Sequence, residues 1–521
     1  MTATRLLEYY ERIADSPQAI ERLRTLVRNL AVRGALLKNS STWTDVTLGE
    51  LGTWGSGGTP LTTYPDYYGG NIPWLKISDL NDSIVTEAET YITDAGLANS
   101  SATLVEPGAI LIAMYGSIGK LGIAGIRCAT NQAIAFCKPN IETVARNYLV
   151  LLLREMRTEL LAKGQGVAQQ NISQKILKRH AVRIPPLAEQ HAIVAKVDEL
   201  MAICDDIERK RTQRETTRDR LTSATLMRLN APDPDLCTFA DHARFAIHSL
   251  DVLTTRADQI KQLRETILNL AVRGKLVPQD PDDEPAVELL KRISATRIAS
   301  SGTRSMQKHG ELDEQHTIPR DWQWARMESI TKLWNGYAFK SIDFVPDGIP
   351  VIRIGNLQGG EVVVSNAVCV KQSVADSVGS SFFVPSGALL IAMSGATTGK
   401  TAVNRTGRAL LLNQRVGRIE IFLMDDAFMG IFLDTLVAKF LSISAGTAIP
   451  NLSSQQINET LVAVPPLPEQ RRIAAKVQEL FMLCNRLESA LIARDKQRCR
   501  LLDALIAETL EPSYAPEPVE A

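Results

Sequence analysis

The clearest pattern in the chain is a narrow apolar stripe in residues 184–208, IPPLAEQHAIVAKVDELMAICDDIE. Apolar residues recur there at alternating spacings of four and three, the period of a helix that buries a coiled-coil seam rather than a broad face. Two prolines suit the turn before a helix, and Glu189 falls in the first turn, where the helix dipole favours a carboxylate. The sequence predicts a long helix over residues 184–228, with seam positions Ile193, Val197, Leu200, Cys204 and Ile207.

The same pattern returns 280 positions later, in residues 464–488, where 13 of the 25 paired residues are identical. A second repeat, offset by 240 positions, pairs LRTLVRNLAVRGALL from Leu23 with LRETILNLAVRGKLV from Leu263. The chain is therefore built twice over. Two apolar stripes of equal length most simply bury each other, and the alternative is that each helix packs on its own neighbouring domain. The seam positions of the second copy are Ile473, Val477, Leu480, Cys484 and Leu487.

Outside the helices, short apolar runs alternate with Gly, Pro and Asn, which is typical of strands and tight turns. IPWLKISDL at 72–80 matches IPVIRIGNL at 349–357, and GVAQQNISQKI from 166 matches GTAIPNLSSQQI from 446. The region from residue 43 to 183 also contains a helical segment, 147–163, and an amide-rich loop, 164–173. The predicted fold class is α+β, with two β-rich domains in tandem repeat joined by long helices.

This organisation gives six parts. They are an N-terminal helical region (1–42), a first β-rich domain (43–183), a central helical region (184–278), a linker (279–321), a second β-rich domain (322–463), and a C-terminal helix with its tail (464–521). Within the central region a less regular piece is expected up to about Asp251. Residues 300–316 are polar and expected to be mobile.

Composition narrows the function classes. Lys plus Arg number 58 and Asp plus Glu number 58, so the chain lacks the basic excess that a free-standing nucleic-acid binder normally shows. If the chain binds DNA, partners are expected to supply much of the phosphate-neutralising charge. Seven cysteines form no CxxC pair and the six histidines are scattered, which argues against a metal site. The absence of an apolar leader or a membrane-length run predicts a cytoplasmic protein with no membrane partner.

The chain resembles the specificity subunits of type I DNA restriction–modification enzymes over nearly its whole length. The segments that carry the resemblance are PPLAEQHAIVAKVDEL and PPLPEQRRIAAKVQEL, NLAVRGALL and NLAVRGKL, and GGTP with IPWLKISDL. The resemblance implies two target-recognition domains, and long helices that form an antiparallel coiled coil. The second domain has YAFKSIDF where the first has GGTPLTTY, so its early loop cannot be carried over from the first.

The resemblance also implies a function without chemistry. Each recognition domain would contact one half of a split, asymmetric target in double-stranded DNA. The helices would fix the gap between the halves and dock two methylation subunits, and translocating restriction subunits would join that core. The chain itself would bind no cofactor, because the methyl donor and ATP would be held by those partners.

The residues agree with the absence of catalysis. Adenine methylation needs a short Asn/Asp-Pro-Pro-aromatic segment, but both Pro-Pro pairs here are followed by Leu. No GxGxxG opens a helix after a strand. GATTGKT from Gly395 resembles a phosphate-binding loop but is one residue too short, and its twin GSIGKL from Gly116 lacks the Ser or Thr that would hold magnesium. Two interpretations of these turns stay open: a phosphate contact through backbone N–H groups and Lys120 or Lys400, or a plain turn with a solvated lysine.

Base-reading candidates are polar loop residues of the types that pair with base edges in the major groove. In the first domain they are Ser56, Thr59, Lys76, Ser78, Asp79, Tyr115, Ser117, Lys120, Gln165, Gln169 and Asn171. In the second they are Asn335, Tyr337, Lys340, Arg353, Asn356, Ser394, Thr397, Thr398, Lys400 and Arg415. Asn131, Asn413, Asn171 and Asn451 stand in repeated turns, where a backbone cap is as plausible as a DNA contact.

Two further groups have a structural and a functional interpretation. Trp74, Trp322, Trp324 and Trp334 are expected to be core anchors rather than base-stacking platforms. The basic run at residues 209–220 is expected to be a solvated helix face, with a DNA-backbone contact as the alternative.

One alternative function is a duplicated coiled-coil scaffold that joins protein partners without reading DNA. A scaffold with two equal partners should keep its duplicated surfaces alike, yet the loops here diverge while the helices are retained. A self-contained methyltransferase–nuclease ranks third, because the motifs for its chemistry are missing.

Overall fold

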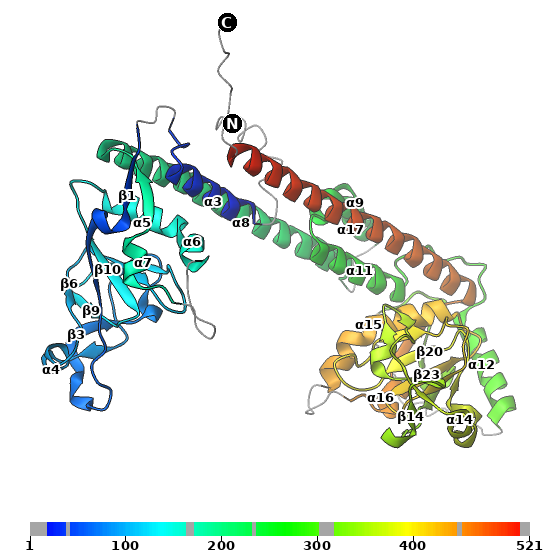
Figure 1. The fold of residues 1–521 in the computed structure, drawn as a ribbon. Helices are drawn as coiled ribbons and strands as arrows, with labels where there is room; N and C mark the ends of the chain where they lie inside the picture. Colours follow the sequence, from blue (N-terminus) through cyan, green and yellow to red (C-terminus); the bar gives the residue numbers. More distant parts are fainter. Residues whose placement is uncertain are drawn as a thin grey trace, which may run out of the picture. The chain divides into compact units, whose positions relative to one another are not determined.

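The computed structural model describes residues 18–37, 42–162, 171–231, 236–301, 317–444 and 451–510. The chain divides into two compact units, Met1–Arg214 with Asp495–Ala521, and Glu215–Arg494. Each unit contains one β-rich domain, which Figure 1 colours blue to cyan in the first unit and yellow to orange in the second. Most of the expected mobile segment, residues 302–316, lies outside the described residues. Across the described ranges, no helix is long and apolar enough to cross a membrane.

Two long helices, α8 (Leu187–Leu229) and α17 (Leu467–Leu510), each contribute residues to both units. The first unit contains the beginning of α8 and the end of α17, and the second contains the end of α8 and the beginning of α17. This crossed sharing is the pattern of two helices that run in opposite directions, so they form an antiparallel pair. The helix predicted from the apolar stripe at residues 184–228 is confirmed.

A buried glutamine ties the start of each long helix to the neighbouring β-rich domain. The Gln190 side-chain amide donates to the Pro185 carbonyl at 2.9 Å, and its oxygen accepts from the Ala145 N–H at 2.8 Å. Gln470 repeats this with the Pro465 carbonyl at 2.8 Å and the Asp425 N–H at 2.9 Å. Since both glutamines are fully buried, the repeated Glu-Gln pair fixes where the helix leaves its domain.

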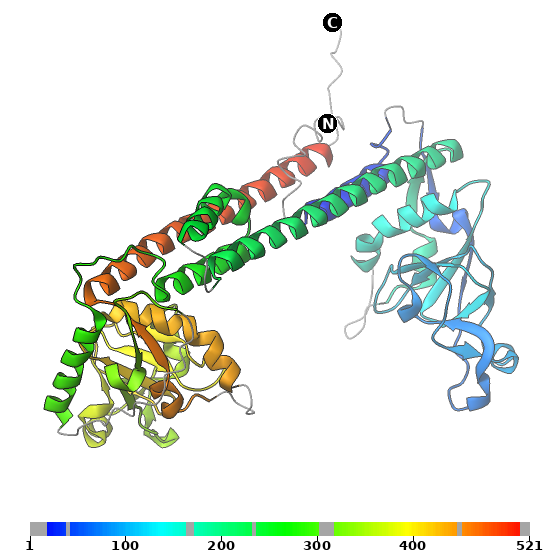
Figure 2. The same cartoon turned by 180° about the vertical axis from the view of Figure 1, so that it is seen from behind.

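A shorter helix lies along each long helix and is clamped to it by an arginine. In the first unit, α3 (Ala19–Val32) places Arg24 within 2.6 Å of Asp205 and 2.7 Å of Glu208, and both views show α3 beside α8 (Figures 1 and 2). In the second unit, α11 (Ala257–Val272) places Arg264 at the matching carboxylate. The partners of Arg264 are Asn485 at 2.7 Å and Glu488 at 3.1 Å. The two internal repeats therefore meet each other within each unit.

The seam positions of the first copy are covered within their own unit. Ile193 and Val197 are buried with α3 and the first β-rich domain. Cys204 is buried with Leu502 and Leu505 near the end of α17. Leu200 and Ile207 are half-buried.

The second copy behaves in the same way. Ile473, Val477 and Cys484 are buried with α11 and the second β-rich domain, and Leu480 and Leu487 are half-buried against the same core. The prediction that the two stripes bury each other is therefore wrong. The repeated helices α3 and α11 and the adjacent domains cover most of these positions, which is close to the alternative interpretation, while Cys204 packs against the end of α17 rather than against its seam residues.

The first β-rich domain contains a two-stranded sheet, β1-β11, a five-stranded sheet in the order β2-β10-β7-β8-β4, and a four-stranded sheet in the order β5-β3-β9-β6. β1 pairs antiparallel with β11, so the first and last strands of the domain lie together. The strands are β1 (Thr44–Thr47), β2 (Gly52–Ser56), β3 (Tyr68–Leu75), β4 (Ile84–Val85), β5 (Tyr91–Ile92), β6 (Leu104–Val105), β7 (Ile110–Ala113), β8 (Leu121–Ala124), β9 (Cys128–Thr130), β10 (Ile134–Pro139) and β11 (Ala181–Ile184).

The second β-rich domain repeats this plan with a two-stranded sheet, β12-β24, a six-stranded sheet, β13-β23-β20-β21-β17-β16, and a five-stranded sheet, β14-β18-β15-β22-β19. The strands are β12 (Gln323–Arg326), β13 (Thr331–Asn335), β14 (Phe344–Val345), β15 (Ile349–Ile352), β16 (Leu357–Gln358), β17 (Glu361–Val362), β18 (Val368–Val370), β19 (Phe383–Val384), β20 (Leu389–Ala392), β21 (Thr401–Val403), β22 (Leu410–Leu412), β23 (Val416–Ile421) and β24 (Leu461–Val464).

Helices complete both units. In the first they are α4 (Asp94–Ala98), α5 (Arg146–Glu155), α6 (Arg157–Ala162) and α7 (Gln174–Lys178). In the second they are α9 (Leu236–His248), α10 (Leu250–Leu253), α12 (Ala286–Ser301), α13 (Met327–Ile330), α14 (Gln372–Val378), α15 (Asp426–Ser444) and α16 (Ser454–Asn458). Two expectations change. The less regular piece before Asp251 is helical, and the helical segment at 147–163 is broken between α5 and α6.

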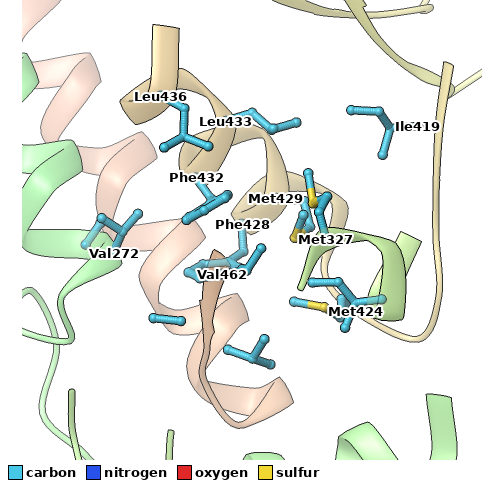
Figure 3. Close-up of a cluster of buried hydrophobic side chains, with 14 of the residues drawn as sticks. Val272, Met327, Ile419, Met424, Phe428, Met429, Phe432, Leu433, Leu436 and Val462 are labelled. Atoms are coloured by element: carbon cyan, nitrogen blue, oxygen red, sulfur yellow. The ribbon is translucent and has the colours of Figure 1, made fainter. Parts of the chain in front are cut away.

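The core of the second unit is built around the apolar helix α15, whose Phe428, Met429, Phe432 and Leu433 are buried. Figure 3 shows these side chains gathered with Val462 of β24. Such a core holds the strand ends in fixed positions, because close-packed interiors leave side chains little room to shift.

Three of the four tryptophans are core anchors, as predicted: Trp74, Trp322 and Trp324 are each at most 6% exposed. The Trp322 indole N–H donates to Glu469 at 3.0 Å in the first turn of α17. Trp334 departs from the prediction. It is half-buried at the surface, with Lys332 stacked 3.8 Å from its ring centroid.

Candidate nucleic-acid interface

Three chain segments meet at the same place in both β-rich domains. In the second domain, the Met393 N–H donates to the Arg415 carbonyl at 2.9 Å, and the Leu452 N–H donates to the Met393 carbonyl at 2.8 Å. These bonds join the end of β20, the turn before β23 and the turn before α16. A β-bridge between Ser394 and Asn451 completes the junction.

The first domain repeats the junction with its own residues. The Met114 N–H donates to the Ala133 carbonyl at 2.8 Å, and the Ile172 N–H donates to the Met114 carbonyl at 2.9 Å. A β-bridge links Tyr115 to Asn171. The backbone frame of the two junctions is therefore the same, while the side chains on it differ.

Two of the repeated asparagines are backbone caps. The Asn131 side-chain oxygen accepts from the Ala133 N–H at 3.2 Å, and that of Asn413 accepts from the Arg415 N–H at 3.4 Å. Each side-chain oxygen holds its own turn, which supports the backbone-cap interpretation of these two residues. Asn171 and Asn451 are exposed instead.

The glycine-rich turns after β7 and β20 use their own N–H groups. Gly119 N–H donates to the Ala113 carbonyl at 2.9 Å, and Gly399 N–H donates to the Ala392 carbonyl at 2.8 Å. The N–H groups of Lys120 and Lys400 likewise donate within the turn, each at 3.0 Å. These four donors are therefore committed within the turns, so a phosphate contact would depend on the lysine side chains and the remaining N–H groups of each turn.

The two lysine side chains on these turns are not equivalent. Lys120 is half-buried and its ammonium donates to the Ile77 carbonyl at 3.3 Å, whereas Lys400 is exposed. The next residue, Thr401, donates its hydroxyl to Asp434 at 3.0 Å. Burial raises the pKa of the Asp434 carboxyl from its ordinary value, and the Thr401 hydroxyl is already bonded to it.

Three predicted base readers are structural instead. Asp79 accepts from the Lys76 N–H at 2.6 Å, and Asn356 accepts from the Arg353 N–H at 2.9 Å, so each caps a short 3₁₀ helix in its own domain, Ile77–Asp79 and Ile354–Asn356. Thr398 is fully buried and donates to the Gly395 carbonyl at 2.7 Å. Because these side chains are bonded within their own turns, their polar atoms are committed to the protein rather than presented to DNA.

The other candidates vary in exposure. Gln165 and Gln169 lie outside the described residues. The exposed candidates are Ser56, Ser78, Tyr115, Ser117 and Asn171 in the first domain, and Asn335, Tyr337, Lys340, Arg353, Lys400 and Arg415 in the second. Thr59, Lys76, Lys120 and Thr397 are half-buried, and Ser394 is buried.

A polar pocket marks the junction in the second domain. Three candidate base readers, Asn335, Ser394 and Arg415, line it together with residues that the sequence did not single out as base readers. The complete lining is Asn335, Met393, Ser394, Gln414, Arg415, Asn451, Leu452, Ser453 and Ser454. Among these described lining residues there is no carboxylate, and Arg415 is the one that carries a formal charge. The signal for Gln414 was the Asn-Gln dipeptide, repeated at 131–132 and 413–414.

Two other basic features are accounted for by protein contacts. The Arg418 guanidinium lies 4.9 Å from the Trp334 ring centroid, and burial lowers the pKa of Arg418 from its ordinary value. On α8, Arg209 and Lys210 pair with Asp206, and Arg218 with Glu215. This supports the solvated helix face expected for the basic run, because such pairs are common on exposed helices.

Comparison with known proteins agrees with this architecture. Residues 40–215 and 319–494 each match the family described as type I restriction modification DNA specificity domain. The EcoAI specificity subunit of Escherichia coli is 28% identical over 400 residues, covering 73% of this chain and 67% of that protein. The MjaIX specificity subunit of Methanocaldococcus jannaschii is 21% identical over 473 residues, covering 89% and 92%.

A solved structure reported for the assembly and conformational transition of a type I R-M system shares the fold. One of its chains superposes with a TM-score of 0.51 at 15% identity, covering 91% of this chain and 100% of that chain. Two matched domains in tandem, joined by long helices, place this chain in the type I restriction–modification DNA specificity family, whose members are non-catalytic subunits that act in DNA recognition.

Proposed function

We propose that this chain reads a bipartite DNA target, with one β-rich domain for each half-site. The observation that carries the proposal is the duplicated junction, which keeps its backbone bonds in both domains and changes its side chains. Tyr115 of the first domain is replaced by Ser394 in the second, and Ala133 by Arg415. A constant frame with different polar groups suits two readers of different sequences.

The long helices would set the gap between the half-sites and dock two methylation subunits. Two features support a paired docking site. Arg24 and Arg264 make the same clamp, one in each unit. Ile203 on α8 and Leu483 on α17 occupy matching positions and are 47% and 44% exposed. Exposed apolar residues repeated in this way suit two copies of one partner.

Translocating restriction subunits would join the methylation core, and the methyl donor and ATP would be bound by those chains. The chain has equal numbers of basic and acidic residues, so counterion release from its own surface gives little affinity for DNA. The partners would then contribute much of the backbone contact, and this chain the sequence discrimination.

A gel shift of the assembled complex tests the proposal. A duplex library with random sequence is incubated with the complex, and the bound fraction is sequenced. Enrichment of one split, asymmetric sequence is the expected result. Retention of the library without enrichment would instead favour a scaffold that does not read DNA.

A further inference from the structure

The pocket of the second domain is built so that its side chains face a ligand while its backbone stays fixed. Gln414 N–H donates to the Tyr337 carbonyl at 3.0 Å, and the Arg415 carbonyl accepts from Met393. The backbone groups of Gln414 and Arg415 are held by these bonds, and both side chains are exposed to solvent and can contact a ligand. This is the preorganisation that a recognition site needs.

An unsatisfied buried group in the pocket points to a missing partner. Ser394 is 7% exposed and lines the pocket, yet its hydroxyl has no hydrogen-bond partner among the described residues. A buried hydroxyl without a partner costs free energy, so the site is complete only when a polar ligand or water reaches it. Beside it, the Asn335 side-chain oxygen accepts from Ser454 at 3.0 Å, which directs the Asn335 amide as a donor.

Comparison of the two junctions identifies what is special to the second. Gln132 matches Gln414, but in the first domain it is hydrogen-bonded to Thr59. Ala133 stands where the second domain has Arg415. No ion pair to Arg415 is found in the described parts of the chain, so the guanidinium is a free cation at a polar pocket. The first junction contains no cation at this position.

We infer that Arg415 reads a guanine in the half-site of the second domain, with Gln414 reading an adenine at an adjacent base pair. Arginine matches guanine O6 and N7 with two donors, and glutamine matches adenine N6 and N7. Neighbouring residues are about 3.8 Å apart and base pairs about 3.4 Å, so the two side chains can reach successive steps. The inference rests on the proposed function and adds which bases are read and by which residues.

The test uses the assembled complex and single-atom changes in DNA. The target is first determined by sequencing the sites that the complex methylates. Each guanine of the second half-site is then replaced by 7-deazaguanine, which lacks the N7 acceptor. At the guanine that Arg415 contacts, the replacement should weaken binding by the wild-type complex on the order of 10-fold and have little effect on binding by the Arg415→Ala complex.

Removing the Arg415 side chain should also relax the sequence specificity at one base pair of the second half-site. Arg415→Ala should bind the cognate duplex on the order of 10- to 100-fold more weakly, with discrimination lost at one base pair and the first half-site read as before. Arg408→Ala is the matched control, since Arg408 is an exposed arginine of the same domain outside the pocket. Its target should not change.

Three results would overturn the inference while leaving the proposed function intact. A second half-site without any guanine would do so. So would equal weakening on all duplexes with a smaller salt slope, which marks a phosphate contact. The third is an unchanged target in the Arg415→Ala complex. If wild-type complex selects no sequence, the proposed function fails instead.

Discussion

Lys400 is the residue whose exposure most clearly predicts a role at the DNA backbone. Its twin Lys120 is bonded to the Ile77 carbonyl, whereas Lys400 extends from a turn held by its own hydrogen bonds. A lysine is a point charge that suits phosphate better than bidentate base reading. Lys400→Ala in the assembled complex should therefore weaken binding to all duplexes alike and lower the salt slope by about one, as measured by salt titration.

Lys291→Ala provides the control for Lys400→Ala. Lys291 is exposed on α12 and paired with Glu288 at 2.7 Å, so its removal should leave the salt slope unchanged. Lys120→Ala should have a smaller effect than Lys400→Ala. Unchanged affinity of the Lys400→Ala complex at every salt concentration would remove this turn from the interface.

At single residues, the sequence identified the loops but not the bonding within them. Asp79 and Asn356 have the right chemistry for base reading, yet each caps a turn whose backbone donor lies three residues earlier. That spacing was visible as Lys-Ile-Ser-Asp and Arg-Ile-Gly-Asn, and a capping interpretation would have excluded both. The Asn-Gln dipeptide alone does not indicate which side chain caps the turn; in the structure Asn413 does so, and Gln414 is left exposed.

At the scale of elements, the long helix α8 makes a testable spacer. Inserting four residues after Glu208 adds about 6 Å and slightly more than one helical turn. The insertion falls between residues clamped by Arg24 in the first unit and by Arg256 in the second, where Arg256 pairs with Glu215 at 2.7 Å. Both clamps are retained, so the tolerated gap should lengthen by one or two base pairs of about 3.4 Å each.

The gap is measured by sequencing the sites that the complex methylates. Lys210→Ala serves as the control, because it changes an exposed residue of the same helix without altering its length. Its gap should stay constant. A gap that is also unchanged after the insertion would contradict the role of α8 as a spacer.

The repeat and the apolar period were sufficient to predict the long helices and the two β-rich domains. They did not predict what covers the seam positions. A stripe such as Ile193 and Val197 shows that a face is buried, but two equal stripes and two equal shorter helices allow more than one pairing. The choice is made by contacts far apart in sequence, such as Arg24 to Asp205, which no local pattern encodes.

For the whole molecule, the separate cores of the two β-rich domains predict independent reading. The first domain begins and ends with paired strands, β1 and β11, so it can be replaced as a closed piece. Exchanging residues 43–183 for the matching domain of a relative should change one half of the methylated target only. Exchange of 322–463 is the reciprocal control, and a simultaneous change in both halves would contradict independent readers.

The balance of charge predicts how the chain behaves without partners. It has no net charge, so few counterions are released when it meets DNA, and Ile203 and Leu483 leave apolar surface on the long helices. The purified chain should therefore bind its target weakly or self-associate, and light scattering with a binding titration at about 0.15 M salt measures both. Adding methylation subunits should restore specific binding and remove the self-association. Tight, sequence-specific binding by the isolated chain would show instead that the recognition domains supply the affinity themselves.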